Sequence, residues 1–265
     1  MISDSFGKNQ KIDIEGSSIE GQVGQAGRDL RQFQFVFAKR KQKDLDQRDR
    51  QALLNKVKNF WIKGVLAQIS DRPLVENRLE ERLDVLEQAW GMVYETPQQL
   101  RQVLPAGIQI TELFCQLGQG GTLLILGEPG CGKTRLLLEL ARDLINFAES
   151  DSEAPIPVVL CLDSWKGGRQ SVANWLIQEL QKRYRISKKL SKKLVEEEYL
   201  LLLLDGFSEV HPNQQETCVQ ALNQFIKRYG KTETIVCSRI QEYLNLSNRL
   251  QFQRAVCILA RSAQI

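Results

Sequence analysis

Zinc-site spacings and membrane-length apolar runs are absent from this sequence. It has one histidine, His211, and none of its six cysteines falls in a Cys-x-x-Cys pair, so no spacing typical of a zinc site is present. Its apolar runs, such as Leu200–Leu204, are far shorter than the roughly 20 residues that span a membrane. Residues 1–10 lack the basic start and the apolar stretch of a secretion signal. We therefore expect no membrane partner.

The cysteines favour a reducing compartment. Several lie inside apolar runs, where a reduced thiol behaves as a small hydrophobic side chain. A reducing cytosol is the simplest environment for such residues, and we expect a cytoplasmic protein. The six cysteines are Cys115, Cys131, Cys161, Cys218, Cys237 and Cys257.

Net charge is also small. The chain carries +4 over 265 residues, which is too little to indicate nucleic acid by itself. The run from Lys182 to Lys193 is basic without an acid inside it, and it could contact nucleic acid or an anionic partner. Tyr184 is its one aromatic residue, and Glu196 to Glu198 follow directly. We expect a solvated face here rather than a nucleic-acid site.

The residue composition and the hydrophobic pattern change twice along the chain, which predicts three parts. Residues 1–45 form a polar, glycine-rich leader, residues 46–110 form a helical segment, and residues 111–265 form an α/β core. In the helical segment, apolar residues recur every three to four positions from Gln47 to Ser70 and again from Val75 to Trp90. This spacing predicts two amphipathic helices.

Beyond residue 121, short apolar strands alternate with helical patterns. Continuous apolar strands are expected where helices cover both faces of a parallel sheet. The expected strands are Thr122–Leu126, Val158–Leu162, Leu200–Leu204, Thr234–Cys237 and Ala255–Leu259. The expected helices lie near Lys133–Phe147, Ser171–Tyr184 and Gln214–Tyr229.

One segment fits the phosphate-binding pattern G-x-x-x-x-G-K-[ST] without a mismatch. Its glycines permit consecutive N–H groups to point inward as an anion-binding nest, and a helix beginning at Lys133 would present its positive dipole end to the same anion. Lys133 can reach the β- and γ-phosphates of ATP, and the hydroxyl of Thr134 can ligate Mg²⁺. The residues are Gly127, Glu128, Pro129, Gly130, Cys131, Gly132, Lys133 and Thr134.

A phosphate loop also needs a carboxylate on a neighbouring strand to hold the magnesium. Asp205 follows the apolar strand Leu200–Leu204, at the end of the strand where ligands of open α/β sheets bind. We expect Asp205 and Thr134 to be the metal-binding pair, with Glu209 four residues further on as a candidate water-activating base.

The segment from Leu201 to Glu209 resembles the second acidic motif of NACHT domains, a family of the STAND class of signal-transduction NTPases. Arg239, after the strand 234–237, resembles the family's γ-phosphate sensor. Segments at 60–64 and 90–93 resemble the regions that precede this domain in cyanobacterial members. The resemblance covers roughly residues 50–265. It implies a P-loop NTPase fold with strand order 5-1-4-3-2, ATP or ADP with Mg²⁺ as cofactors, and catalytic roles for Lys133, Glu209 and Arg239.

Two departures from the family pattern affect the expected activity. Ser208 stands where the family usually has the first of two distal acids. Residues 240–265 leave no room for the helical lid and winged helix with their nucleotide-contacting histidine, and His211, which lies just after the acidic strand, is expected to be a loop residue. We therefore expect slow hydrolysis and either a homo-oligomer or a partner chain that supplies the lid.

The leader leaves two alternatives open. The segment from Gly21 to Gly24 resembles the core of short amyloid-signalling motifs of bacterial NACHT proteins, and its glycines would suit the turns of a stacked β arrangement. A disordered or single-strand leader is the alternative.

Two functions compete for the whole chain. The first is a nucleotide-dependent oligomerisation switch that hydrolyses ATP slowly. The second is a degenerate or truncated nucleotide-binding adaptor with little or no hydrolysis. A small-molecule kinase or a GTPase is disfavoured, because no Asn-Lys-x-Asp motif follows the phosphate loop and no arginine-rich lid is present.

Overall fold

The computed structural model describes residues 45–70, 78–87, 100–168 and 170–259. All of these belong to one compact unit, which spans residues 33–265. The leader, with its candidate assembly motif, lies outside the described residues, apart from Leu45. None of the helices within the described ranges is long and apolar enough to cross a membrane.

One mixed sheet of seven strands forms the centre of the described chain, with the order β2-β1-β7-β3-β6-β5-β4. Strands β3 to β7 run parallel, whereas β1 pairs antiparallel with both β7 and β2. Counted from the phosphate-loop strand, the parallel part reads 5-1-4-3-2, as the family resemblance implied. The strands are β1 Arg78–Arg82, β2 Arg101–Val103, β3 Thr122–Gly127, β4 Ile156–Cys161, β5 Leu200–Asp205, β6 Thr234–Arg239 and β7 Arg254–Leu259.

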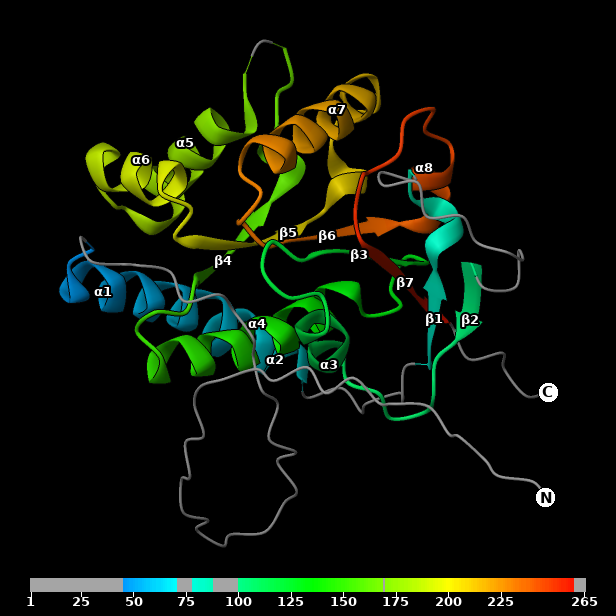
Figure 1. Ribbon diagram of the computed structural model, residues 1–265, viewed down its shortest axis with the longest axis horizontal. Helices are drawn as coiled ribbons and strands as arrows, with labels where there is room; N and C mark the ends of the chain where they lie inside the picture. Colours follow the sequence, from blue (N-terminus) through cyan, green and yellow to red (C-terminus); the bar gives the residue numbers. More distant parts are fainter. Residues whose placement is uncertain (1–44, 71–77, 88–99, 169, 260–265) are drawn as a thin grey trace, which may run out of the picture. The chain divides into compact units, whose positions relative to one another are not determined.

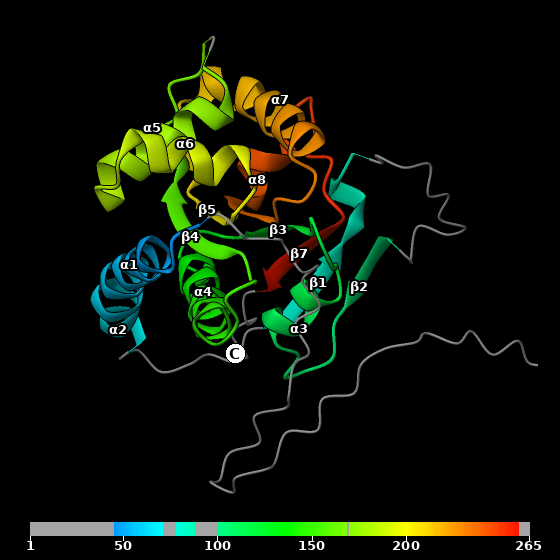
Figure 2. The ribbon, with the colours of Figure 1, turned by 60° about the vertical axis from the view of Figure 1, so that its left-hand side comes forward.

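Helices cover both faces of this sheet (Figures 1 and 2). Helices α1, α3 and α4 lie on one face, and α5, α6 and α7 lie on the other. The helices are α1 Gln47–Val57, α2 Ala67–Ser70, α3 Ile110–Cys115, α4 Lys133–Ser150, α5 Val172–Tyr184, α6 Lys188–Glu196, α7 Pro212–Arg228 and α8 Ile240–Leu244. A π-helical segment, Lys58–Leu66, joins α1 to α2, and single 3-10 turns occur at Leu83–Val85, Leu162–Ser164 and Phe207–Glu209.

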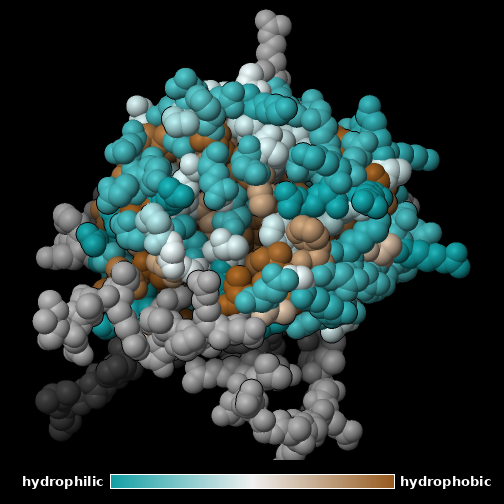
Figure 3. All heavy atoms as spheres, turned by 180° about the vertical axis from the view of Figure 1, so that it is seen from behind, coloured by the Kyte–Doolittle hydropathy of each residue, from teal (hydrophilic) through white to brown (hydrophobic). Residues whose placement is uncertain are grey.

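The five parallel strands were predicted correctly because their central residues are apolar in every case. Every residue of β3 is buried, and β4 and β5 are buried except for their last residues. Side chains on both faces of such strands face helices, so no polar alternation is needed. The outer surface is different. Figure 3 shows that the face turned away in Figure 1 is mostly hydrophilic, with hydrophobic residues in small separate groups.

The second helix of the 46–110 segment was predicted wrongly. Residues Arg78–Arg82 form the strand β1 instead. The spacing of Leu79, Leu83 and Leu86 fits a helix, but β1 pairs with the otherwise open edge of β7, and this long-range pairing outweighs the local pattern. Leu83–Val85 form a 3-10 turn, and residues 75–77 and 88–90 of the predicted helix lie outside the described ranges.

The first helix was predicted correctly, although its middle is π-helical. Asp46 caps its start by accepting a hydrogen bond from the Arg48 N–H at 2.8 Å. The buried Arg50 donates to the Ala148 and Asp151 carbonyls at 2.9 and 3.0 Å, where α4 ends. The N-terminal helix therefore holds the far end of the helix that follows the phosphate loop.

Candidate functional site

The loop between β3 and α4 adopts a conformation that glycine permits. Gly130 and Gly132 have φ values of +76° and +97°, in the left-handed region that other residues rarely enter. Gly127 is needed for a different reason, since a Cβ there would lie 2.5 Å from the Cys131 sulfur. The three glycines therefore close the loop tightly in front of the α4 N-terminus, where free N–H groups attract anions.

Lys133 directs its ammonium group into this loop. Its Nζ donates to the carbonyl oxygens of Gly127 at 2.9 Å and Glu128 at 2.8 Å. An ammonium group has three donors, and the third points to the Cys131 sulfur at 3.9 Å, a weak acceptor that an anion can replace. The positive charge is thus fixed at the concave side of the loop by the loop's own backbone.

Thr134 and Asp205 are brought together from elements that are 71 residues apart. The Thr134 hydroxyl donates to Asp205 Oδ2 at 2.7 Å, and Asp205 Oδ1 accepts from the Gly206 N–H at 2.9 Å. Asp205 is the last residue of β5, so the strand directs it toward the first turn of α4. A hydroxyl and a carboxylate oxygen in contact fit Mg²⁺, which prefers oxygen ligands.

No group of three or more histidine, cysteine, aspartate or glutamate side chains that could hold a metal occurs in the part of the chain that the structure describes. Binding of Mg²⁺ does not require such a group. Magnesium commonly keeps several waters and is bound through one or two protein groups together with substrate phosphates.

Glu209 lies in the short turn that follows β5. Its N–H donates to the Gly206 carbonyl at 2.9 Å, and its carboxylate lies beside Gly206, where an added Cβ would meet Glu209 Oε2 at 3.0 Å. Glu209 is exposed, whereas Ser208 is half-buried. The turn therefore keeps a carboxylate close to the strand end that carries Asp205.

The backbone of Arg239 lies beside the phosphate loop, but its side chain is paired with a residue outside the loop. It is the direct partner of Gly127 in the parallel pair of β3 and β6. Its guanidinium, however, forms an ion pair with Glu242 at 3.2 Å and is 43% exposed. Sequence reasoning missed Glu242, because the short helix α8 that carries it was not predicted.

His211 lies at a helix start. Its Nδ1 accepts from the Asn213 N–H at 3.4 Å, and Pro212 is the first residue of α7. This imidazole acts as the N-cap of α7, which is a more defined place than the loop position predicted for it.

Burial keeps the thiols around these strand ends neutral. It raises the pKa of Cys161 and of Cys257 to about 11, and it raises the pKa of Cys237 well above the usual value. A neutral thiol is a poor nucleophile and a poor metal ligand. These cysteines therefore contribute packing rather than chemistry.

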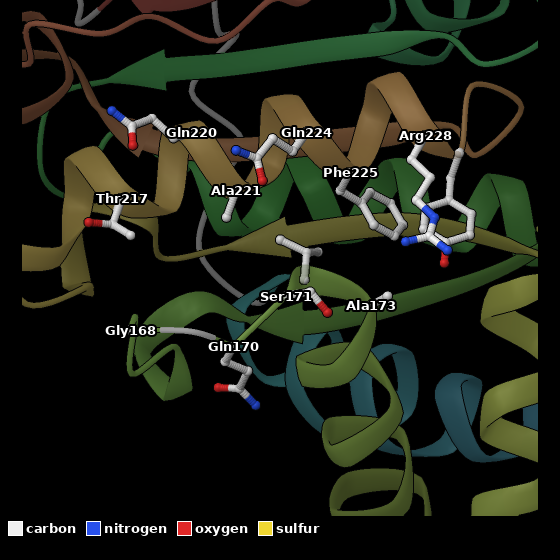
Figure 4. A pocket seen from close by; sticks show the side chains of 12 residues that line it. Gly168, Gln170, Ser171, Ala173, Thr217, Gln220, Ala221, Gln224, Phe225 and Arg228 are labelled. Atoms are coloured by element: carbon white, nitrogen blue, oxygen red, sulfur yellow. The ribbon is translucent and has the colours of Figure 1, made fainter.

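A hollow of about 370 Å³ between α5 and α7 is separate from these residues. Figure 4 shows Gln220, Gln224 and Arg228 along α7, opposite Ser171 at the start of α5. None of the phosphate-loop residues lines it, and neither do Asp205, Glu209 or Arg239.

A parallel sheet in this order, with a phosphate loop between its first strand and the next helix, defines the class of P-loop NTPases. Within that class, the sequence profile of the NACHT domain matches residues 121–259. This match covers more than half of the chain, and the protein belongs to the NACHT family. No significant match to a curated protein was found. The family match and the phosphate loop together make the chain a nucleotide-binding P-loop NTPase of the NACHT type.

Proposed function

We propose that this protein is an ATP–Mg²⁺-dependent signalling switch of the STAND class, which oligomerises when ATP replaces ADP and hydrolyses ATP slowly. The observation that carries the proposal is the contact of Thr134 with Asp205 at 2.7 Å, next to a loop that already holds the Lys133 ammonium. The groups that we assign to phosphate and to metal thus lie at one place, which supports the proposal.

Each residue has a role in this proposal. The loop from Gly127 to Gly132 binds phosphate oxygens through its N–H groups, and Lys133 contributes the positive charge. Thr134 and Asp205 would hold Mg²⁺, whose positive charge would offset the charge of the phosphates. Glu209 accepts a proton from the attacking water, and Arg239 stabilises negative charge at the γ-phosphate.

Slow hydrolysis is supported by two features. Ser208 has no carboxylate to assist Glu209, and a positioned general base typically contributes about 10²–10⁴ in rate. Arg239 is held by Glu242, so this ion pair must break before the guanidinium can reach a phosphate. Both features favour a long-lived ATP state, which suits a switch better than a metabolic enzyme.

A switch also needs two states that ATP and ADP bind with different affinity. We place the second state in assembly with further copies of the chain or with a partner chain that completes the site, in the cytoplasm of a bacterial cell. In this proposal residues 1–45 form the signalling leader, residues 46–110 connect it to the core, and residues 111–265 bind the nucleotide.

The direct test is the molar mass of the full chain by light scattering in ADP–Mg²⁺ and in ATP–Mg²⁺. We expect a larger molar mass in ATP–Mg²⁺ than in ADP–Mg²⁺. The Lys133→Ala variant should show the smaller mass in both nucleotides. A single mass in both nucleotides, with ATP binding intact, would refute the switch.

A degenerate nucleotide-binding adaptor is the second candidate, and the ion pair of Arg239 with Glu242 favours it. If Arg239 takes no part in hydrolysis, as in an adaptor, Glu242→Ala should leave hydrolysis unchanged although it releases the guanidinium. If the pair is a latch on a working switch, Glu242→Ala should raise single-turnover hydrolysis. The same assay with Glu242→Gln, which removes the charge but keeps the size, separates the ion pair from packing.

A further inference from the structure

An exposed aromatic ring lies beside the basic run that sequence reasoning assigned to solvent. Phe60, in the π-helical segment, is 50% exposed. The Arg183 guanidinium lies over its ring at 5.9 Å and over the Trp61 ring at 5.3 Å. Tyr184 is the one aromatic residue of the basic run in the sequence, and its side chain is buried; the fold supplies an exposed ring from another element.

Contacts at the edge strand β4 explain why Arg183 lies over Phe60. The Tyr184 hydroxyl donates to the Val159 carbonyl at 2.6 Å and accepts from the Val159 N–H at 3.2 Å, so it covers the open side of the last strand. The same hydroxyl accepts from Trp61 Nε1 at 3.1 Å. The end of α5 therefore crosses the sheet edge and is fixed against the N-terminal helix, which places Arg183 on Phe60.

Positive charge continues from this point onto α6. Lys56 Nζ donates to the Arg185 carbonyl at 3.3 Å, and Arg185, Lys188 and Lys189 are exposed. Among the described residues, these last three side chains form no ion pair. We call Lys56, Phe60, Arg183, Arg185, Lys188 and Lys189 the basic–aromatic surface.

A polar groove adjoins the basic–aromatic surface. It has a volume of about 900 Å³ between α5 and α6, and Lys188 belongs to its lining. Most of the other lining residues carry amides, including Asn174, Gln178 and Gln181. Amides both donate and accept hydrogen bonds, so the groove can contact the polar edges of a ligand as well as its charge.

We propose that the basic–aromatic surface binds single-stranded nucleic acid. Proteins that bind single strands without sequence preference combine a cationic path for the phosphates with aromatic rings on which bases stack. The lysines and arginines of this surface provide the path, and Phe60 provides the ring. A duplex hides its base faces inside the stack, so Phe60 discriminates in favour of the single strand. An acidic protein would use the charges but has no need of the ring.

The test measures anisotropy of a labelled oligothymidylate of about 20 nucleotides, which is longer than the ~4–16 nucleotides that one small domain covers. The full chain is used, and a duplex of the same length is the comparison. We expect Lys188→Glu with Lys189→Glu to weaken single-strand binding by about tenfold or more. In wild type, log K falls with log salt, and the double variant should lower that slope by ~0.7 per lost phosphate contact.

The ring is tested separately from the charge. Phe60→Leu keeps an apolar side chain of similar size, and it should weaken single-strand binding by about fivefold to hundredfold while duplex binding changes little. Phe60→Trp should retain single-strand binding. Because Phe60 is half exposed, both variants are expected to fold, which circular dichroism and the melting temperature check.

Two control variants locate the binding surface. Lys227→Glu with Arg228→Glu changes the net charge equally on α7 and should leave binding within about twofold, because the contacts are local. Lys133→Ala should also leave it unchanged, which excludes the phosphate loop as the binding site. The proposal would be overturned if the α6 and α7 double variants weakened single-strand binding equally. It would also be overturned if Phe60→Leu did not change single-strand binding. Binding to polyglutamate or to phosphatidylserine vesicles without binding to the oligonucleotide would overturn it as well.

Discussion

The hydroxyl of Thr134 donates a hydrogen bond to the carboxylate of Asp205 across 2.7 Å. The first residue belongs to the start of α4 and the second to the end of β5, so the contact depends on the parallel packing of two separate strands and their helices. It unites the phosphate loop with the acidic strand end, and the first two predictions examine the two halves of that arrangement.

Lys133→Ala should weaken ATP–Mg²⁺ binding by about one to two decades. A charge-assisted hydrogen bond contributes roughly 1.5–3 kcal/mol, and the loop fixes this ammonium in advance through two carbonyls. Calorimetric titration of both proteins measures the difference. Lys166→Ala is the matched control, because this lysine is outside the loop. Equal affinity of wild type and Lys133→Ala would mean that ATP binds elsewhere.

Asp205→Asn should remove most of the gain in affinity that Mg²⁺ provides and leave metal-free nucleotide binding nearly intact. Asparagine keeps the shape of aspartate but loses the negative charge that a cation needs. Titrations of nucleotide with and without Mg²⁺ test this prediction. An identical loss in both conditions would indicate damage to the fold rather than to the metal site.

Ser208 and Glu209 can be separated by single-turnover hydrolysis. If Glu209 alone acts as the base, Glu209→Gln should remove the residual activity and Ser208→Asp should change little. If a carboxylate at position 208 is better placed than Glu209 to act as the base, Ser208→Asp should raise turnover at unchanged nucleotide affinity. Wild-type turnover at about 10 per second, the median for enzymes, would refute both the slow switch and the adaptor.

Cys131 should be alkylated by iodoacetamide faster than the other thiols, and ATP–Mg²⁺ should protect it. Burial raises the pKa of the other five, to about 12 for Cys115 and Cys218 and to about 11 for Cys161 and Cys257, and it also holds Cys237 neutral. Thiolates are the species that react.

Peptide mapping at several times locates the modified cysteine. Cys131→Ser should abolish the fast phase, and Lys133→Ala should keep the fast phase but lose protection by the nucleotide. Rapid labelling that ATP–Mg²⁺ does not slow would place the nucleotide away from this loop.

Glu216 should make stability depend on pH in the acid range. Burial acts to raise its pKa, but hydrogen bonds from the Asn248 side chain and from the N–H groups of Ser247 and Asn248 outweigh it and lower the pKa of Glu216. A depressed folded pKa gives stability that is present above the unfolded value near 4.5 and is lost as pH falls through the folded value.

The melting temperature of Glu216→Gln should therefore lie below that of wild type at neutral pH, and the two should converge at low pH. Glu197→Gln, at the end of α6, is the control and should show a smaller gap. A gap between wild type and Glu216→Gln that is constant with pH would contradict the prediction.

Most of the fold was predictable from the sequence, and the reason is local. Strands β3 to β7 have apolar central residues, with polar residues only at their ends, and α4 begins where the loop glycines end. The helix α6 was missed because its lysines dominate its composition, although it is an amphipathic helix with Leu194 and Val195 buried.

The sequence by itself predicted the phosphate loop, since all eight residues are contiguous and their pattern is recognisable without a distant partner. It also determined Asp205, because a residue that ends a buried parallel strand must reach the edge of the sheet where the loop lies. Tertiary structure alone decided that residues 78–82 would be a strand, that Arg239 would meet Glu242, and that Phe60 would lie under Arg183. These arrangements depend on an open sheet edge and on segments far apart in the chain, and such long-range pairing leaves no mark in a local pattern of residues.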